Sequence, residues 1–204
     1  MKKLLTTMSI CLAAVALVAL PAAAECVISG TITAAENDGD PELGAWCYTL
    51  EVTWDTGDPT SLSHLDLIVD LPGGSCECHE IAESVNFAYP AGSSDGYPDG
   101  CMVDYEAFLE CNGDPSIPIE GILFKWEPLD MDPFCEPGPM GTGQFTFYSD
   151  YGPVPVDDSL PLVAEKNAGE YCEGTIDGVF PGLPCNPVGV EARTWSEVKG
   201  LYTR

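Results

Sequence analysis

The sequence predicts an all-β fold: an antiparallel, disulfide-stapled β-sandwich of seven or more strands. Apolar residues alternate with polar ones in several short runs, which is the two-residue period of a half-buried strand. Clusters of Gly, Pro, Asn and Asp stand between the runs and favour turns. Ten cysteines accompany them. No stretch has the spacing of alternating strands and helices, so the pattern argues against a parallel α/β fold.

The amino-terminal residues predict export from the cytoplasm. Two lysines precede an apolar run over residues 4–20, and three small residues end at Ala24. This order is typical of a cleaved signal peptide, and the apolar run is short for a membrane span. We therefore expect residues 1–24 to be a signal peptide, with the mature chain beginning at Glu25.

Net charge and cysteine content indicate which partners are excluded and how the chain is cross-linked. Without its leader the chain holds five Lys and Arg against 33 Asp and Glu, a net charge of −28. Such a chain is repelled by nucleic acid and by anionic lipid, so we expect no nucleic-acid partner and no membrane insertion after cleavage. Nine cysteines remain, and in an exported chain they are expected to form disulfides. An odd number leaves one cysteine over.

The strand patterns follow in chain order. In the clearest run, residues 46–54, every second side chain from Tyr48 to Trp54 is apolar. Trp54 and Trp126 fall on inward faces and are expected in the core. The other expected strands show the same alternation or are rich in aromatic and β-branched residues, and they lie at 26–34, 65–71, 103–109, 122–126, 145–147 and 171–176.

The chain divides into two unequal parts. Residues 25–186 are expected to form the acidic sandwich, and residues 187–204 a linker and a short amphipathic C-terminal helix. That end holds three of the five mature basic residues. Its apolar residues recur at helical spacing: Trp195, Val198, Leu201 and Tyr202. The helix either packs back on the sandwich or serves as a docking tail.

Short motifs resemble those of secreted bacterial Ig-like domains. They are the strand motif Tyr48–Val52, the Leu62–Leu65 motif that opens the next strand, the strand Gly143–Phe147 and the loop between Cys172 and Cys185. The ending Thr194–Tyr202 is similar to short C-terminal segments of exported bacterial proteins. The resemblance implies an immunoglobulin-like, extracellular surface or adhesion-like module, and it transfers no catalytic residue.

The densest group of metal-binding residue types is His64, Cys76, Cys78 and His79, which includes both histidines of the chain. Two thiolates and two imidazoles would suit zinc or copper. However, one residue separates the two cysteines, whereas paired zinc cysteines normally have at least two between them. In an oxidising compartment, disulfides at Cys76 and Cys78 are the alternative.

An acidic turn is the second candidate site. It places several oxygen ligands close together: Asn37, Asp38, Asp40 and Glu42. Calcium takes six to eight oxygens and is bound by exposed loops of extracellular modules, so calcium is the cofactor this turn predicts. The alternative is a set of solvated turn residues.

Three disulfides are expected from proximity along the chain: Cys101–Cys111, Cys172–Cys185 and Cys26–Cys47. The first two would each close a short segment, and the third would join two early strands.

The sequence does not predict a catalytic site. The chain lacks a His-Glu-x-x-His helix, and with 33 Asp and Glu, chance pairs of carboxylates are no signal for glycoside hydrolysis. We therefore expect a non-catalytic extracellular binding or structural module of a bacterial cell exterior, whose partner is an extracellular protein or surface component. The alternative is a secreted metal- or ligand-binding protein that uses His64, Cys76, Cys78 and His79.

Overall fold

A computed structural model gives the fold. It describes residues 26–56, 62–70, 74–97, 100–129, 135–156, 160–167 and 170–185. The predicted signal peptide and the predicted C-terminal helix with its four docking residues lie outside the described residues. Among the described residues, no helix has the length and apolar character needed to cross a membrane.

The described part of the chain is almost entirely strand. Its elements, in chain order, are β1 (Val27–Glu36), β2 (Trp46–Asp55), β3 (His64–Asp70), α1 (Cys78–Ala82), β4 (Val85–Asn86), β5 (Gly92–Tyr97), β6 (Met102–Glu110), β7 (Ile122–Pro128), β8 (Glu136–Pro137), β9 (Met140–Ser149), β10 (Pro153–Pro155), β11 (Leu160–Asn167) and β12 (Glu170–Pro181). Every strand expected from the sequence is present. The short helix α1 was not expected.

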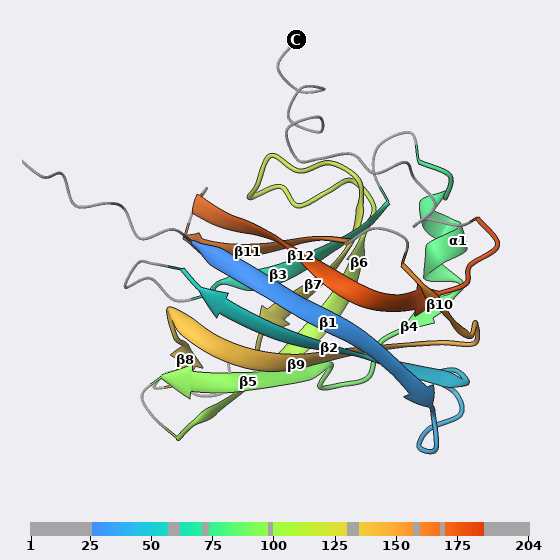
Figure 1. The fold of residues 1–204 in the computed structure, drawn as a ribbon, viewed down its shortest axis with the longest axis horizontal. Coiled ribbons are helices and arrows are strands. Elements are labelled where there is room, and N and C mark those ends of the chain that lie inside the picture. The colour runs from blue at the N-terminus through green and yellow to red at the C-terminus, as the bar shows by residue number, and fades with distance from the viewer. Residues whose placement is uncertain are drawn as a thin grey trace, which may run out of the picture.

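The strands form one sheet that curls round on itself (Figure 1). The hydrogen-bonded order runs β9-β2-β1-β12-β11-β3-β7-β6-β5, and β5 also pairs with β9. The path therefore returns to its starting strand. The longest ladder joins β2 to β9, from Trp46 opposite Ser149 to Asp55 opposite Met140. Because β1 pairs with β2 along its whole length as well, these three strands form the regular part of the sheet.

The arrangement confirms a β-rich, disulfide-linked protein of more than seven strands but differs from an antiparallel sandwich. β1 and β12 run parallel, with Ser29 opposite Thr175 and Ile32 opposite Gly178. The sheet is therefore mixed, and its strands form one continuous path instead of two stacked antiparallel sheets. Alternation could not show this, because it specifies which face of a strand is buried and not which strand lies beside it.

One apolar core fills the inside of the curled sheet. Its largest members are aromatic side chains from β2, β6, β7, β9 and β12. Trp54 and Trp126 are buried there, as predicted. The rings of Tyr48 and Phe147 stack with centroids 4.9 Å apart, across the β2–β9 pair. Burying such side chains typically contributes about 1.5–3 kcal/mol each, so this core is the main stabilising feature of the fold.

All three predicted disulfide pairings are wrong. The structure instead joins Cys26–Cys172, Cys76–Cys185, Cys78–Cys111 and Cys101–Cys135, and leaves Cys47 as the free cysteine. The prediction assumed that cysteines near one another in sequence pair. Sheet pairing, in contrast, brings together residues up to 146 positions apart.

Strand register explains the Cys26–Cys172 bond. Along the parallel β1–β12 pair each residue lies opposite one 146 positions later, as Ser29 does opposite Thr175. Cys26 and Cys172 have the same separation, so the disulfide continues the register of the two strands. Cys47 lies opposite Ala35, toward the other end of β1, and is out of reach of Cys26.

Residues 111–121, which we call the covering segment, lie over the outer face of β3. Ile117 and Ile119 pack there against Ile68 of β3 and Leu123 of β7 in a second small apolar cluster. All seven residues of β3 are consequently buried. The alternation in β3 predicts the outward direction of His64, Asp66 and Asp70, but the outer face carries a cover instead of facing solvent.

Candidate functional site

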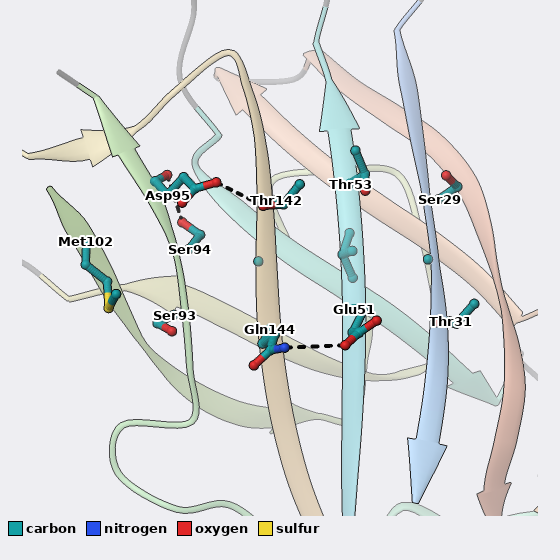
Figure 2. A pocket seen from close by; sticks show the side chains of 13 residues that line it. Ser29, Thr31, Glu51, Thr53, Ser93, Ser94, Asp95, Met102, Thr142 and Gln144 are labelled. Carbon is teal, nitrogen blue, oxygen red and sulfur yellow. Dashed lines mark hydrogen bonds between the residues drawn. The ribbon is translucent and has the colours of Figure 1, made fainter. Parts of the chain in front are cut away.

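One cavity of the described residues is a hollow on the outer face of β1, β2, β9 and β5 (Figure 2). It has a volume of about 640 Å³ and opens to solvent. We call it the polar hollow, and its lining residues are Ser29, Gly30, Thr31, Glu51, Val52, Thr53, Ser93, Ser94, Asp95, Met102, Thr142, Gly143 and Gln144. Most of the labelled side chains are hydroxyls, with one amide and two carboxylates among them.

The side chains that line the polar hollow form rows across the sheet, because the strand register places them directly opposite one another. Thr31 of β1 lies opposite Glu51 of β2, which lies opposite Gln144 of β9, and Gln144 lies opposite Ser93 of β5. Along this row Gln144 Nε2 donates a hydrogen bond to Glu51 Oε1 at 3.4 Å (Figure 2). The row crosses four strands, so the position of each group is fixed by the backbone ladder.

The second row ends at Asp95. Ser29 lies opposite Thr53, and Thr53 lies opposite Thr142. Thr142 Oγ1 then donates to Asp95 Oδ2 at 2.9 Å. Each carboxylate of the polar hollow thus accepts one bond from a neighbouring strand and keeps further lone pairs for a ligand.

The lining of the polar hollow is acidic and contains no Lys, Arg or His. Carboxylates, hydroxyls and an amide offer mainly hydrogen-bond acceptors, which suits a cation or a polar neutral group and disfavours an anion. Two exposed side chains stand near Asp95. Met102 lies opposite it on β6, and Tyr97 is two residues further along β5, on the same face.

A second candidate site lies largely buried between β3, β7 and the covering segment. His64 and Asp66 on β3 meet Asp114 of the covering segment, and Lys125 of β7 reaches the same place; we call these four residues the buried cluster. His64 Nε2 lies 3.2 Å from Asp114 Oδ2 and 3.4 Å from Asp66 Oδ2. Lys125 Nζ lies 2.7 Å from Asp114 Oδ2 and 2.6 Å from Glu127 Oε1.

Burial and charge act against each other in this cluster. Burial raises the pKa of Asp66, and His64 only partly opposes it. Burial also acts to raise the pKa of Asp114, but hydrogen bonds from Lys125 and Ser116 outweigh it and the pKa is lowered. For His64, burial acts to lower the pKa, whereas Asp66 and Asp114 raise it, and the net direction is upward.

The predicted His–Cys metal cluster does not form. Cys76 is bonded to Cys185 and Cys78 to Cys111, so neither sulfur is a thiolate. His79 lies on α1 and is exposed, whereas His64 lies buried on β3. The prediction failed because it took sequence neighbours as spatial neighbours, and because the oxidised state of both cysteines removes them as ligands.

The predicted calcium turn forms the connection between β1 and β2. Two of its side chains bond to the backbone of their own turn. Asn37 Nδ2 donates to the carbonyl of Asp40 at 2.6 Å, and Asp40 Oδ1 accepts from the amide of Glu42 at 2.9 Å. These bonds shape the turn, and calcium binding there stays a prediction.

Sequence reasoning missed both candidate sites in part. Nothing in the alternation of β2 or β9 distinguishes the residues of the polar hollow from other outward polar residues. Asp114 stands among turn-forming residues, and nothing in the local sequence indicates that it bridges to Ile119 within the covering segment or that it meets His64. A signal was available for the buried cluster, since a histidine and an aspartate alternate at positions 64 and 66 of a strand that is otherwise apolar.

Comparison with known proteins adds no identification. No protein-family model, no curated protein and no solved structure matches this chain. The four disulfides fit a protein that folds in an oxidising compartment, outside the cytoplasm. Any function must therefore be argued from the geometry of the chain itself.

Proposed function

We propose that this protein is a non-catalytic extracellular binding module, and that the polar hollow binds a Lys- or Arg-bearing segment of an extracellular partner protein. The observation that supports this is the presence of two carboxylates, Glu51 and Asp95, among hydroxyls and an amide in a lining without a basic residue. The surface or adhesion role implied by the Ig-like resemblance is part of the same proposal.

The whole chain favours a cationic ligand. Its net charge is −26, and a cavity lined by one sign of charge concentrates the field there. Such a field raises the rate of encounter with positively charged ligands and repels anionic ones. Met102 is 73% exposed beside the hollow and can contact the aliphatic stem of a lysine. Tyr97, 65% exposed, can lie against its ammonium group.

The test measures binding of an oligolysine peptide to the mature protein by calorimetry at low and physiological salt. The double variant Glu51→Gln/Asp95→Asn should bind about tenfold more weakly or worse, since hydrogen bonds to charged groups contribute about 1.5–3 kcal/mol each and partial solvent exposure reduces this. Salt should weaken binding to the native protein by screening.

A matched control removes the same charge elsewhere. Asp38 and Glu42 are exposed on the turn beyond the end of β1, outside the polar hollow, so Asp38→Asn/Glu42→Gln should bind like the native protein. Equal weakening in both double variants would mean that only net charge matters, and the proposed site would be wrong. If the protein bound a neutral oligosaccharide and not oligolysine, the proposed cationic ligand would be wrong and a hydroxyl-rich ligand would take its place.

A further inference from the structure

We infer that His64, Asp66 and Asp114 form a binding site for one divalent transition-metal cation, with Zn²⁺ as the best match. The three residues offer one imidazole nitrogen and two carboxylate oxygens, and these ligand atoms lie within 4.8 Å of one another. Mixed nitrogen and oxygen donors suit zinc and its neighbours, whereas calcium and magnesium prefer oxygen alone.

The spacing of the donor atoms fits a small tetrahedral ion. With bonds of about 2.0–2.1 Å, the ligand atoms of a tetrahedral zinc site stand roughly 3.3 Å apart. His64 Nε2 lies 3.2 Å from Asp114 Oδ2 and 3.4 Å from Asp66 Oδ2. The third edge, between Asp66 and Asp114, lies within the same 4.8 Å, and a small rotation of the Asp66 carboxylate, which makes no well-formed hydrogen bond, would close it.

The state of Asp66 is the independent observation that points to a ligand. Its side chain has no exposed surface, and neither oxygen makes a well-formed hydrogen bond to a described residue, its contact there being the His64 imidazole 3.4 Å from Oδ2. A buried carboxylate without such bonds is costly unless it is neutralised or coordinates a metal. One of its oxygens lies within 4.8 Å of the ligand atoms that His64 and Asp114 offer.

Lys125 does not remove the need for a cation. Its ammonium lies between Asp114 and Glu127 and can balance only one carboxylate. Counted together, Asp66, Asp114 and Glu127 carry three negative charges against this single positive one. A divalent cation brings that sum to zero, with His64 neutral as a metal ligand must be.

An ion at this place would join two parts of the fold. His64 and Asp66 come from β3, whereas Asp114 comes from the covering segment. Asp114 is already positioned for this, since its Oδ1 accepts from the amide of Ser116 at 2.7 Å and leaves Oδ2 directed at His64 and Lys125. Metal binding would therefore fix the covering segment on the sheet.

The experiment uses the mature, disulfide-bonded protein stripped with a chelator and titrated with Zn²⁺. We expect one Zn²⁺ per chain, and at a hundredfold excess over Kd a rise in the thermal midpoint of roughly 5–10 °C. Replacement by Co²⁺ should give the visible absorption of a tetrahedral site. Asp66→Asn should weaken Zn²⁺ binding at least a hundredfold and abolish the thermal shift, while folding normally without metal because it buries a neutral group.

The second histidine provides the matched control. His79 is exposed on α1, so His79→Gln should bind Zn²⁺ like the native protein, whereas His64→Gln should not. Zn²⁺ binding that survives Asp66→Asn and is lost in His79→Gln would assign the metal to the surface and overturn the inference. A stripped protein that neither binds Zn²⁺ nor shifts its midpoint would show that protons alone neutralise the cluster, which also overturns it.

Discussion

At the residue scale, the parallel contact between β1 and β12 depends on a position without a side chain. Gly178 has a φ of +129°, and a Cβ placed there would stand 2.1 Å from the carbonyl oxygen of Ile32. Ile32 is its direct partner in the register. The two strands can therefore approach only because this residue is glycine.

Gly178→Ala should lower the free energy of unfolding by about 2–4 kcal/mol, because it combines backbone strain with a clash against rigid backbone. Gly100 provides the control. It has a φ of +88° and no atom within 4 Å of its missing Cβ, so Gly100→Ala should cost only about 1–2 kcal/mol. Urea unfolding measures both. Equal losses would mean that the clash at Gly178 relaxes without cost.

The candidate sites show what residue patterns can and cannot predict. Alternation along β3 correctly puts His64 and Asp66 on one face. Asp114 joins them from 48 residues beyond Asp66, through a segment whose path depends on packing by Ile117 and Ile119. No local rule connects these positions. The polar hollow is even less visible, because it consists of ordinary outward residues whose neighbours are set by strand order.

At the element scale, local sequence predicts the strands well and their partners poorly. The period of two in β2 and β3 follows from burial of one face, and both strands form where expected. The pairing of β1 with β12 and of β5 with β9 follows from the closing of the whole sheet. The short helix α1 escaped notice because its five residues are too few for a helical period.

The Cys26–Cys172 disulfide should be the main restraint on the parallel junction. It closes a chain segment of 146 residues, so loss of both sulfurs should lower stability by about 5 kcal/mol in the chain-entropy model. In Cys26→Ser/Cys172→Ser, hydrogen exchange should rise first in β1 and β12, because the strands lose their lateral tie at one end.

The disulfide Cys101–Cys135 is the comparison. It spans 34 residues beside β5 and β6, so its removal should leave the exchange of β1 and β12 unchanged. Mass spectrometry of peptic peptides measures both variants. Uniform loss of protection in the first variant would show that the junction does not open separately from the rest of the sheet.

At the scale of the whole molecule, charge is the dominant surface property. Residues 26–185 hold 30 of the 33 acidic residues and only two lysines. Lys125 is one of the two, and it is already held by Asp114 and Glu127. The acidic groups of residues 26–185 therefore far outnumber the basic ones, and their mutual repulsion opposes the compact state.

Added NaCl should consequently raise the thermal midpoint at pH 7. The Debye length falls from about 30 Å at 0.01 M to about 10 Å at 0.1 M, which screens carboxylates on different parts of the surface from one another. Each kcal/mol gained should shift the midpoint by about 2–4 °C for a domain of this size. At pH 4 about half of ordinary exposed carboxylates are protonated, so the same salt should have a smaller effect. Calorimetry measures the midpoint, and a chelator is present so that bound metal ions do not contribute to it. A midpoint that does not change with NaCl at pH 7 would mean that the charges lie too far apart to repel one another measurably.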